Sequence, residues 1–548
     1  MDMGHDGRPS LKVQQAQAIA VQALGLAARG FLAEAESELR RALVMLPGDP
    51  AISFNLARVL MTSHRPGEAL HLVNQTLAGE ANRSANLLLL RAQILLAMAR
   101  HAEAIIAFKE AIEADPHNGL AELGLATALG ESRQPLATAE AAQRAIHKGA
   151  DRPSARYILG RSLNECGRFQ EAESELRRAV QLNPDHEPSQ VMLAELIWMQ
   201  TSDVTLATHE LDRSLQRQPH ATGLRVTKAK LLESAGHTAA AVAELEAGLE
   251  RDPNNLQLRL AAAQALVAEQ PLRALFHAEC AFRLAPRDLA VVAIYGDTLF
   301  AAGRVADAEK VAMHGLQIHP NNNHSIALLG NVWRWKGDSR YQELFDYNAL
   351  VRASPLETPA GWSTLAAYLA DLARSLHELH QLNAHPVNQT LRRGSQIGIE
   401  LEALKDSALH AFPQAIDGLI RKYMAAIGHG MDVFRRRNTM RYKLNGMWTV
   451  RLRPQGHHVN HFHGQGWLSS VCYIELPETL GKQGGEGWLK LGEPLLGPSD
   501  RKLDPEFFLK PEPGLLALFP SWMWHGTVPF SGSEKDRRLT IAFDVVPA

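Results

Sequence analysis

Histidine is concentrated in one segment, GHHVNHFHG, which holds His457, His458, His461 and His463. Side chains at positions i and i+2 of a strand face the same side. If the segment is extended, His461 and His463 can therefore chelate one ion, and His457 could share their face. A third imidazole, His525, follows in FPSWMWHGTVPF. Two ligands on one strand and a third from a distant strand would form a facial metal site at the mouth of a barrel.

A purely structural role is the alternative for these histidines. A lone histidine in a strand is more often a packed or exposed residue than a ligand, and a pair at i, i+2 is only suggestive. The distant third histidine favours metal, because aromatic strand residues flank all three. Imidazole suits iron, zinc, copper and nickel alike, so the ligand type does not name the ion.

Short strands surround these histidines. From about residue 436 the hydrophobic period is two, and glycine and proline turns separate the apolar runs. The runs are RYKLNGMWTVRLRP, WLSSVCYIELP, GWLKLGEP, GLLALFP and RLTIAFDVVP. Several such strands without intervening helices predict a compact barrel or jelly roll.

Two helices are predicted ahead of this β core, at residues 363–383 and at roughly 397–427. The polar segment HPVNQTLRRGSQ lies between them and contains a proline and a glycine, which predicts a loop. The segment SPLETPAGW, residues 354–362, carries two prolines and marks a boundary.

The first three hundred residues repeat with a period of about 34 residues. Small alanines recur at steps of 33 to 35 residues, at Ala35, Ala69, Ala104, Ala137, Ala172, Ala207, Ala241, Ala274 and Ala308. Most repeats end at a proline, namely Pro47, Pro116, Pro184, Pro219, Pro253, Pro286 and Pro320. Proline stops a helix because it cannot continue the hydrogen-bond ladder.

These features resemble the tetratricopeptide repeat, with nine units over about residues 16–321 and a weaker helical tail to about residue 350. Such a solenoid leaves an extended concave face. We expect that face to bind a protein or peptide partner. A spacer or a self-association module is the alternative, because fold does not fix function.

The β core resembles a known family. The runs NHFHGQGWLSSVCYIELPE, GWLKLGEP, PGLLALFPSWMWHGTVPF and RRLTIAFDVVP are similar, in order and spacing, to a bacterial family of 2-oxoglutarate–Fe(II) oxygenases. Members of that family often carry N-terminal tetratricopeptide repeats. The resemblance covers roughly residues 355–548. It implies a double-stranded β-helix that coordinates iron, binds 2-oxoglutarate and activates dioxygen.

The resemblance also implies roles for single residues. His461 and His525 would be the two histidine ligands, and Arg538 would pair with the distal carboxylate of 2-oxoglutarate. A planar guanidinium suits that task because it can bind a carboxylate through two hydrogen bonds. Thr540 could donate its hydroxyl to the same carboxylate, and Tyr473 is a lesser candidate for a hydrogen bond to the cosubstrate.

One position departs from the wider superfamily, which places an acidic residue where this chain has His463. His463 can replace that carboxylate as the third ligand, or it can swing aside and leave water in its place. The site can also prefer another metal or lack catalysis. The three-histidine site is favoured because this branch of the family carries HxH habitually. A neutral third ligand would leave the iron more positive.

Two further choices concern neighbours of the site. Arg537 could act instead of Arg538, but strand alternation lets only one of them point inward. Arg538 is favoured because it keeps phase with Thr540. Trp522 and Trp524 are expected in the core or the pocket wall rather than in the chemistry.

The composition is that of an ordinary globular protein, with 46% hydrophobic and 21% charged residues, which argues against wholesale disorder. The 57 basic and 59 acidic residues nearly cancel, so no basic field points to nucleic acid. Cys166, Cys280 and Cys472 form no CxxC pair, which indicates a reducing compartment. The polar N-terminus lacks the apolar stretch of a secretory signal, and no run approaches the ~20 apolar residues of a membrane span. A cytoplasmic protein is expected.

These observations predict a multidomain chain. An all-α tetratricopeptide solenoid at residues 16–350 precedes an α+β domain with a double-stranded β-helix (jelly-roll) core at residues 355–548. The predicted function is an Fe(II)- and 2-oxoglutarate-dependent dioxygenase that hydroxylates a protein or peptide recruited by the repeats. The alternatives are an interaction scaffold with a non-catalytic metal site and an oxygenase of a small metabolite. The sequence does not decide the substrate or the oligomeric state.

Overall fold

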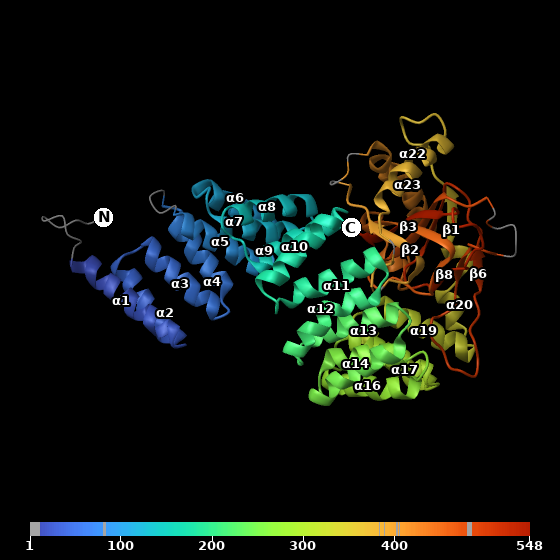
Figure 1. Cartoon of the computed structure of the whole chain (residues 1–548), viewed down its shortest axis with the longest axis horizontal. Helices are drawn as coiled ribbons and strands as arrows, with labels where there is room; N and C mark the ends of the chain where they lie inside the picture. The colour runs from blue at the N-terminus through green and yellow to red at the C-terminus, as the bar shows by residue number, and fades with distance from the viewer. Residues whose placement is uncertain are drawn as a thin grey trace. The chain divides into compact units, whose positions relative to one another are not determined.

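A computed structural model describes residues 11–79, 84–382, 384–387, 389–401, 404, 406–478, 480 and 485–548. The chain divides into two compact units, Met1–Pro184 and Asp185–Ala548 (Figure 1). The first ten residues, which hold most of the polar N-terminus considered above, lie outside the described part.

The first unit is a stack of helices. Each helix packs against the next one along the chain, and helices two apart, such as α1 and α3, also touch, as in a repeat solenoid. The helices are α1 (Leu11–Ala28), α2 (Leu32–Met45), α3 (Pro50–Thr62), α4 (Pro66–Leu77), α5 (Ala85–Ala97), α6 (His101–Ala114), α7 (Gly119–Glu131), α8 (Pro135–His147), α9 (Pro153–Glu165) and α10 (Phe169–Leu182).

The second unit continues this pattern and then changes to a β-domain. Its repeat helices are α11 (Glu187–Thr201), α12 (Val204–Arg217), α13 (Thr222–Ser234), α14 (Thr238–Arg251), α15 (Leu256–Leu266), α16 (Pro271–Leu284), α17 (Leu289–Ala301), α18 (Val305–Ile318) and α19 (Asn323–Lys336). The short helices α20 (Arg340–Leu344) and α21 (Tyr347–Leu350) follow, so the helical tail ends at the predicted position. Within the described residues, α1–α18 form nine consecutive pairs, as many as the units predicted.

The repeat signals in the sequence have a direct structural meaning. Every repeat proline follows the end of a helix by two residues, as Pro47 follows Met45 and Pro320 follows Ile318. The repeat alanines are buried, because only a small side chain allows the helices to approach closely. Ala137 is the exception, and its neighbour Thr138 is the buried residue in that repeat.

The β-domain contains two antiparallel sheets. The larger sheet has the order β1-β7-β4-β9-β3-β2, and the smaller has the order β6-β5-β8. The strands are β1 (Arg352–Pro355), β2 (Leu391–Gly398), β3 (Tyr442–His458), β4 (Leu468–Glu475), β5 (Leu489–Leu491), β6 (Phe507–Leu509), β7 (Leu515–Pro520), β8 (His525–Thr527) and β9 (Arg538–Pro547). The predicted fold class, a tetratricopeptide solenoid followed by a domain with an antiparallel β core, is confirmed.

Helices α22 (Leu365–Leu379) and α23 (Ser407–Ile427) pack on one face of the larger sheet (Figure 1). Tyr368 and Phe412 from these helices share a buried core with Cys472 of β4 and Phe543 of β9. Because strand residues alternate between faces, the other face of β4 and β9 is left to line a cavity.

Two elements predicted ahead of the β core, a loop and a helix, have other limits in the structure. The segment HPVNQTLRRGSQ, predicted as a loop, runs into β2, an edge strand that pairs only with β3. The helix predicted from about residue 397 begins only at Ser407, and residues 402, 403 and 405 lie outside the described part. The predicted boundary at 354–362 overlaps β1, which pairs with β7. The strand β6 was not among the predicted runs, whereas β8 begins at His525, which was expected on a strand of its own.

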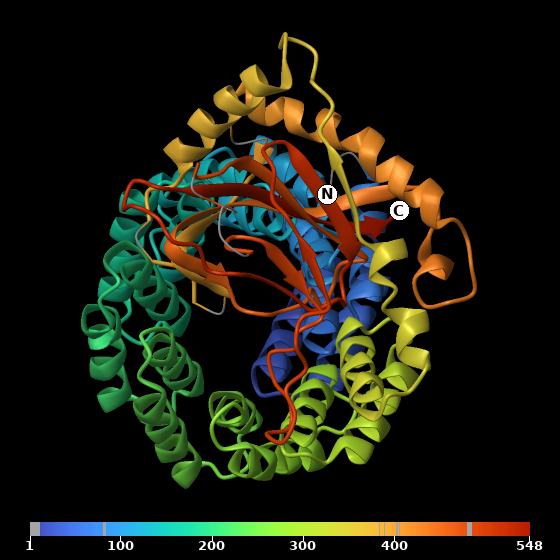
Figure 2. The ribbon, with the colours of Figure 1, turned by 90° about the vertical axis from the view of Figure 1, so that its right-hand side faces the viewer.

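The repeat helices of the second unit form an arc that contacts the β-domain at both ends (Figure 2). At the first end, the indole N–H of Trp198 in α11 donates to the carbonyl of His385 at 3.0 Å. At the other end, Arg334 in α19 donates to the carbonyls of Gly492 at 2.7 Å and Asp504 at 2.6 Å. These repeats and the β-domain therefore share one folded unit.

The domain limits of 16–350 and 355–548 stay a prediction, because the division at Pro184 and Asp185 groups the later repeats with the β-domain. No helix among the described residues is both long enough and apolar enough to cross a membrane.

Candidate metal centre

Three histidines converge beside the smaller sheet. One ligand atom from each of His461, His463 and His525 lies within 4.8 Å of the other two. The ring centroids of His461 and His525 are 4.2 Å apart, and those of His461 and His463 are 5.3 Å apart. His525 is the first residue of β8, and His461 pairs with it in an isolated β-bridge.

The prediction that His461 and His463 lie on one strand is wrong. The strand β3 ends at His458, and both residues lie in the loop that follows. Two backbone contacts place them instead. The amide of His461 donates to the carbonyl of His525 at 2.9 Å, and the amide of His463 donates to the carbonyl of Ser521 at 2.8 Å.

Each of the three rings uses its Nδ1 atom for a protein hydrogen bond. His461 Nδ1 lies 2.8 Å from the carbonyl of Val459, and His525 Nδ1 lies 2.9 Å from the carbonyl of Met523. A carbonyl can only accept, so Nδ1 carries the proton in both rings and the Nε2 lone pair is left free. This is the tautomer in which a metal-binding histidine is usually held.

His463 has a stronger partner than the other two. Its Nδ1 atom lies 2.6 Å from Oδ1 of Asp544, which is itself buried. The hydroxyl of Ser469 donates to the same carboxylate at 2.9 Å and lies 3.0 Å from the hydroxyl of Ser521. A carboxylate behind an imidazole fixes the ring and raises the basicity of its other nitrogen.

Burial keeps the imidazoles of His461, His525 and His458 neutral. Burial and the neighbouring His463 lower the pKa of His461 to about 3. Burial also lowers the pKa of His525 well below its usual value, and that of His458 likewise, with His461 as the next cause for both. Neutral rings with free lone pairs are the form that binds a cation.

The rings of all three histidines line one cavity. It lies between the two sheets, because its wall includes Val471 of β4 and Ala542 of β9 on one side and Leu489 of β5 and Thr527 of β8 on the other. Besides the three histidines, the polar groups of its wall are His458, Ser470, Thr527, Arg538 and Thr540.

Arg538 is a buried cation in this wall, with only 2% of its surface exposed. Its Nε has no hydrogen-bond partner, and no acidic side chain among the described residues forms an ion pair with it. Its guanidinium carbon lies 5.1 Å from the ring centroid of Tyr473. Burial lowers the pKa of Arg538, and an unpaired buried charge is costly, so an anion is expected to join it.

The other predicted residues lie as follows. Thr540 lines the cavity beside Arg538, whereas Arg537 is half-buried and donates to the carbonyls of Glu534 and Asp536. His457 does not join the cluster. Its neighbour in the sequence, His458, lines the cavity instead.

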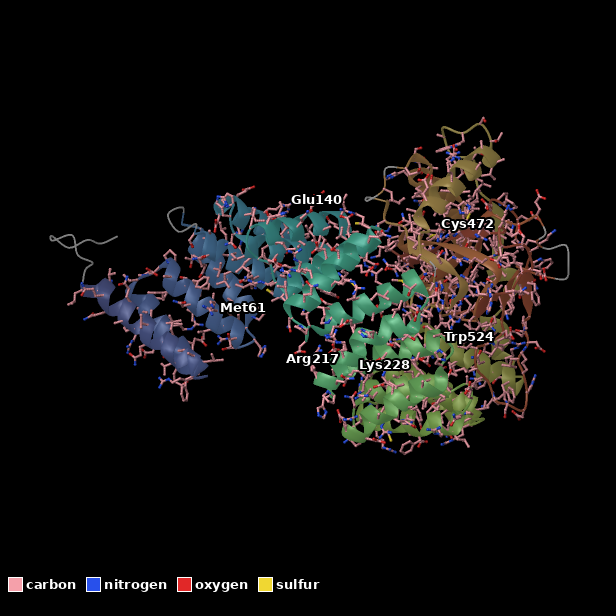
Figure 3. All side chains as sticks on the ribbon, viewed as in Figure 1. Met61, Glu140, Arg217, Lys228, Cys472 and Trp524 are labelled. Atoms are coloured by element: carbon pink, nitrogen blue, oxygen red, sulfur yellow. The ribbon has the colours of Figure 1, made fainter. Side chains whose placement is uncertain are left out.

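Trp522 and Trp524 belong to the buried core rather than to the cavity wall. Figure 3 labels Trp524 and Cys472, which mark the β-domain in that view. Trp524 packs edge-on against Phe462, with centroids 4.9 Å apart. Phe462 stands between His461 and His463, so this contact helps to hold the loop that carries them.

Asp544 was missed by the sequence analysis, although a signal for it exists. Arg538 and Thr540 were placed on one face of the last strand, and the same alternation reaches Asp544. An acid at an inward position of an apolar strand is rarely left without a partner. Here that partner is His463.

The residues present fit a metal ion and an anionic cosubstrate. One ring nitrogen from each histidine lies within 4.8 Å of the other two, and the Nδ1 atoms already have protein partners, so the Nε2 lone pairs are available to a cation. In the same cavity, Arg538 has an unpaired Nε and would be satisfied by an anion. A 2-oxo acid with a second carboxylate carries one group for each.

Comparison with known proteins gives matching results. Residues 446–544 match the family model described as "Putative 2OG-Fe(II) oxygenase". Three models of the tetratricopeptide repeat match residues 26–94, 85–118 and 123–187. No curated protein matches the chain.

Solved structures with similarity include a tetratricopeptide repeat protein from Parabacteroides merdae, at 14% identity and a TM-score of 0.37, covering 46% of this chain and 99% of that one. Pseudomonas aeruginosa pilF matches at 19% identity and a TM-score of 0.36, covering 39% of this chain and 97% of that one. The protein TTC0263 from Thermus thermophilus matches at 20% identity and a TM-score of 0.28, covering 33% and 98%.

The chain thus joins N-terminal tetratricopeptide repeats to a C-terminal domain of the putative 2OG-Fe(II) oxygenase family.

Proposed function

We propose that the β-domain is an Fe(II)- and 2-oxoglutarate-dependent dioxygenase that hydroxylates its substrate. The observation that carries this proposal is the presence of two complementary groups in one cavity. Three converging imidazoles suit a divalent metal, and Arg538 is a buried cation without an acidic partner among the described residues. 2-Oxoglutarate has one end that chelates a metal and another that pairs with a guanidinium.

In this proposal His461, His463 and His525 hold Fe(II) through their Nε2 atoms. Their Nδ1 contacts to Val459 O, Asp544 and Met523 O orient the rings before the metal arrives. The site is of the three-histidine type. In the wider superfamily a carboxylate binds the iron directly. Here the carboxylate of Asp544 contacts Nδ1 of His463 instead.

Arg538 binds the distal carboxylate of 2-oxoglutarate through its planar fork. Thr540 lies on the same strand face and donates its hydroxyl to that carboxylate, and the Tyr473 ring supports the guanidinium from the side at 5.1 Å. Arg538 and the histidines hold the two ends of the cosubstrate, so they fix its direction in the cavity.

When bound, Fe(II) and 2-oxoglutarate supply the oxidising chemistry that couples decarboxylation to hydroxylation. The protein supplies geometry and exclusion of water. Trp448, Val450, Leu489 and Phe519 are apolar members of the cavity wall and keep bulk solvent from the reacting centre.

We further propose that the substrate is a protein or peptide bound by the repeats. The support is the matching of several repeat models along the chain and the concave surface that such helices offer. Incubating candidate partners with the enzyme and measuring a mass gain of one oxygen atom tests this. A small metabolite that is hydroxylated equally fast with and without any partner would contradict it.

The first test of the reaction is an anaerobic titration of the purified protein with Fe(II) and 2-oxoglutarate, followed by measurement of succinate after oxygen is added. His525→Ala should abolish iron binding, and Arg538→Ala should abolish 2-oxoglutarate binding while iron still binds. Arg537→Ala is the matched control, because this neighbouring arginine points away from the cavity and should leave both bindings unchanged.

Succinate that depends on both iron and 2-oxoglutarate, and that is lost in the two site variants only, would support the oxygenase. If the wild-type protein binds neither iron nor 2-oxoglutarate, the proposal fails.

A further inference from the structure

The loop that carries two of the three candidate ligands is held by a repeat helix as well as by the β-domain. This loop, residues 459–467, lies outside the strands apart from the single bridge at His461. The β-domain holds its inner side through the His463 amide and Ser521 carbonyl. The helix α19 holds the other side.

Asn323, the first residue of α19, makes this contact. Its side-chain Nδ2 donates to the carbonyl of His463 at 2.8 Å and to the carbonyl of Gly466 at 2.7 Å. Asn323 is buried, with 1% of its surface exposed. Both partners are acceptors only, so the amide must present both of its N–H groups to them. The backbone of His463 is thus fixed through its N–H by Ser521 and through its C=O by Asn323.

The next residue adds a second contact to the same loop. The ring of His324 meets Phe462 edge-on, with centroids 5.0 Å apart. Its Nε2 lies 2.9 Å from Oδ2 of Asp297 in α17. The helix α19 therefore contacts the residue between His461 and His463 directly, and α17 supports that contact through His324.

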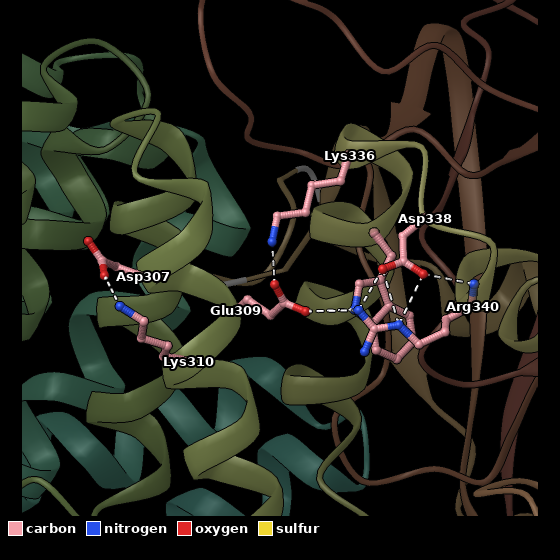
Figure 4. Close-up of polar contacts among 7 residues, drawn as sticks. Asp307, Glu309, Lys310, Lys336, Asp338 and Arg340 are labelled. Carbon is pink, nitrogen blue, oxygen red and sulfur yellow. Dashed lines mark hydrogen bonds and ion pairs between the residues drawn. The ribbon is translucent and has the colours of Figure 1, made fainter.

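The helix α19 is itself firmly held, so it can act as a fixed support. Glu309 of α18 pairs with Lys336 at the end of α19 and with Arg340 of α20, the latter at 3.2 Å (Figure 4). Arg340 also pairs with Asp338 at 2.5 Å. At this same end, Arg334 donates to Gly492 and Asp504 of the β-domain.

We propose that α19, the helix that follows the ninth repeat pair, is a structural part of the metal centre, with Asn323 as a positioning residue that aims His463 at the metal. The inference rests on the proposed metal site. It gives the repeats a role besides binding a partner, because without α19 the loop loses both hydrogen bonds from Asn323 and the ring contact from His324. We expect a movement of α17 or α19 to alter the affinity of the site for metal, because α19 contacts the loop and α17 contacts His324 of α19.

The test is metal binding by the full-length chain, with Co(II) alone as an oxygen-stable probe. Calorimetry gives the dissociation constant, and the visible absorption of bound Co(II) reports the ligand geometry at saturation. Asn323→Ala should weaken binding about 10-fold, the size seen when an outer partner of a ligand is lost. It should also change the spectrum of the saturated protein.

Three further variants make the result specific. Asn323→Asp keeps the shape of the side chain but has no N–H to donate, so it should bind Co(II) more weakly still. If the side chain of Asn323 mattered only for packing, Asn323→Asp would bind Co(II) more tightly than Asn323→Ala. Asn323→Ser is the mildest change and keeps one donor, so it should fold and show a smaller loss. Asn322→Ala is the matched control, because Asn322 caps the same helix through the Ser325 amide at 2.8 Å and does not touch the loop.

The outcomes separate the two proposals. If the wild-type protein binds Co(II) and the Asn323 variants bind it within twofold with unchanged spectra, the role of the repeat is overturned while the metal site stands. If Asn322→Ala weakens binding as much as Asn323→Ala, the effect belongs to the helix and the proposal also fails. If the wild-type protein binds no Co(II), the metal site itself is wrong.

Discussion

His463 stands where the wider superfamily has an acidic residue, and Asp544 places a carboxylate on the far side of its ring at 2.6 Å. A negative charge therefore stays near the proposed metal site, as a hydrogen-bond partner of His463 rather than as a ligand. Asp544→Asn should weaken Co(II) or Fe(II) binding about 10-fold, because the neutral amide raises the basicity of His463 much less. Calorimetry on the full-length protein measures this. Asp536→Asn, a surface aspartate beside the same strand, is the control, and an equal loss in both variants would refute the role of Asp544.

Arg538 is expected to lower the stability of the ligand-free protein and to strengthen the binding of an anion. Its buried charge has no acidic partner among the described residues, so it costs folding free energy until an anion arrives. Arg538→Met keeps the volume and removes the charge. We expect the Tm of the protein without ligands to stay level or rise, and the further rise caused by 2-oxoglutarate with Mn(II) to disappear.

Thermal unfolding with and without the two ligands measures both effects. A ligand at 100 times its dissociation constant stabilises by about 2.7 kcal/mol, which gives a clear shift in wild-type protein. Arg537→Met should keep that shift. A large fall in the Tm of ligand-free Arg538→Met would show that the guanidinium is satisfied in the folded protein and would contradict the argument.

Prediction of the elements from sequence succeeded where a long pattern existed. The alanine and proline periods fixed the repeat helices, and the longer strands β3, β4, β7 and β9 were found from alternation. The edge strand β2 was missed because its polar residues do not alternate with apolar ones.

The same limit applies to the site. His461, His463, His525 and Arg538 could be named from spacing and resemblance. Asn323 could not, since it lies in a repeat helix 140 residues away from His463, where nothing local distinguishes it.

The junction between α22 and the larger sheet should respond to pH. His380 follows α22 and is buried, and its two ring nitrogens lie 2.8 Å from Ser395 Oγ and 3.1 Å from Thr449 Oγ1. Burial, with Arg451 and His377 as further causes, lowers the pKa of His380 to about 3. Since an unfolded histidine titrates near 6.5, the unfolded chain binds more protons between these values, and stability is lost as the pH falls from about 6.5 toward 3.

His380→Gln keeps hydrogen-bonding groups but cannot titrate. Its Tm should therefore fall less than that of the wild-type protein between pH 7 and pH 5. Both proteins should be measured with excess chelator, so that metal release from the other histidines does not contribute. Parallel curves for the two proteins would show that His380 does not link this junction to pH.

At the scale of the second unit, the repeats and the β-domain depend on each other. Leu503, in the connection between β5 and β6, is buried in a core built from α16–α19, and burying one leucine contributes about 1.5–3 kcal/mol. Arg501 of the same connection lies over the ring of Trp335, 5.4 Å from its centroid, and donates to its carbonyl at 3.1 Å. Tyr341 of α20 hydrogen-bonds to Glu506.

A fragment of residues 351–548 keeps β1 but loses all of these contacts together with Asn323, whereas a fragment of residues 185–548 keeps them. We expect the longer fragment to bind Co(II) with the affinity of the full-length chain. The shorter fragment should unfold at a lower temperature and bind Co(II) at least 10-fold more weakly, because the loop at 459–467 has lost its outer support. Equal affinity and equal Tm for the two fragments would mean that the β-domain is self-sufficient. The repeats would then matter only for what they bind, so this comparison decides whether they also help to build the metal centre.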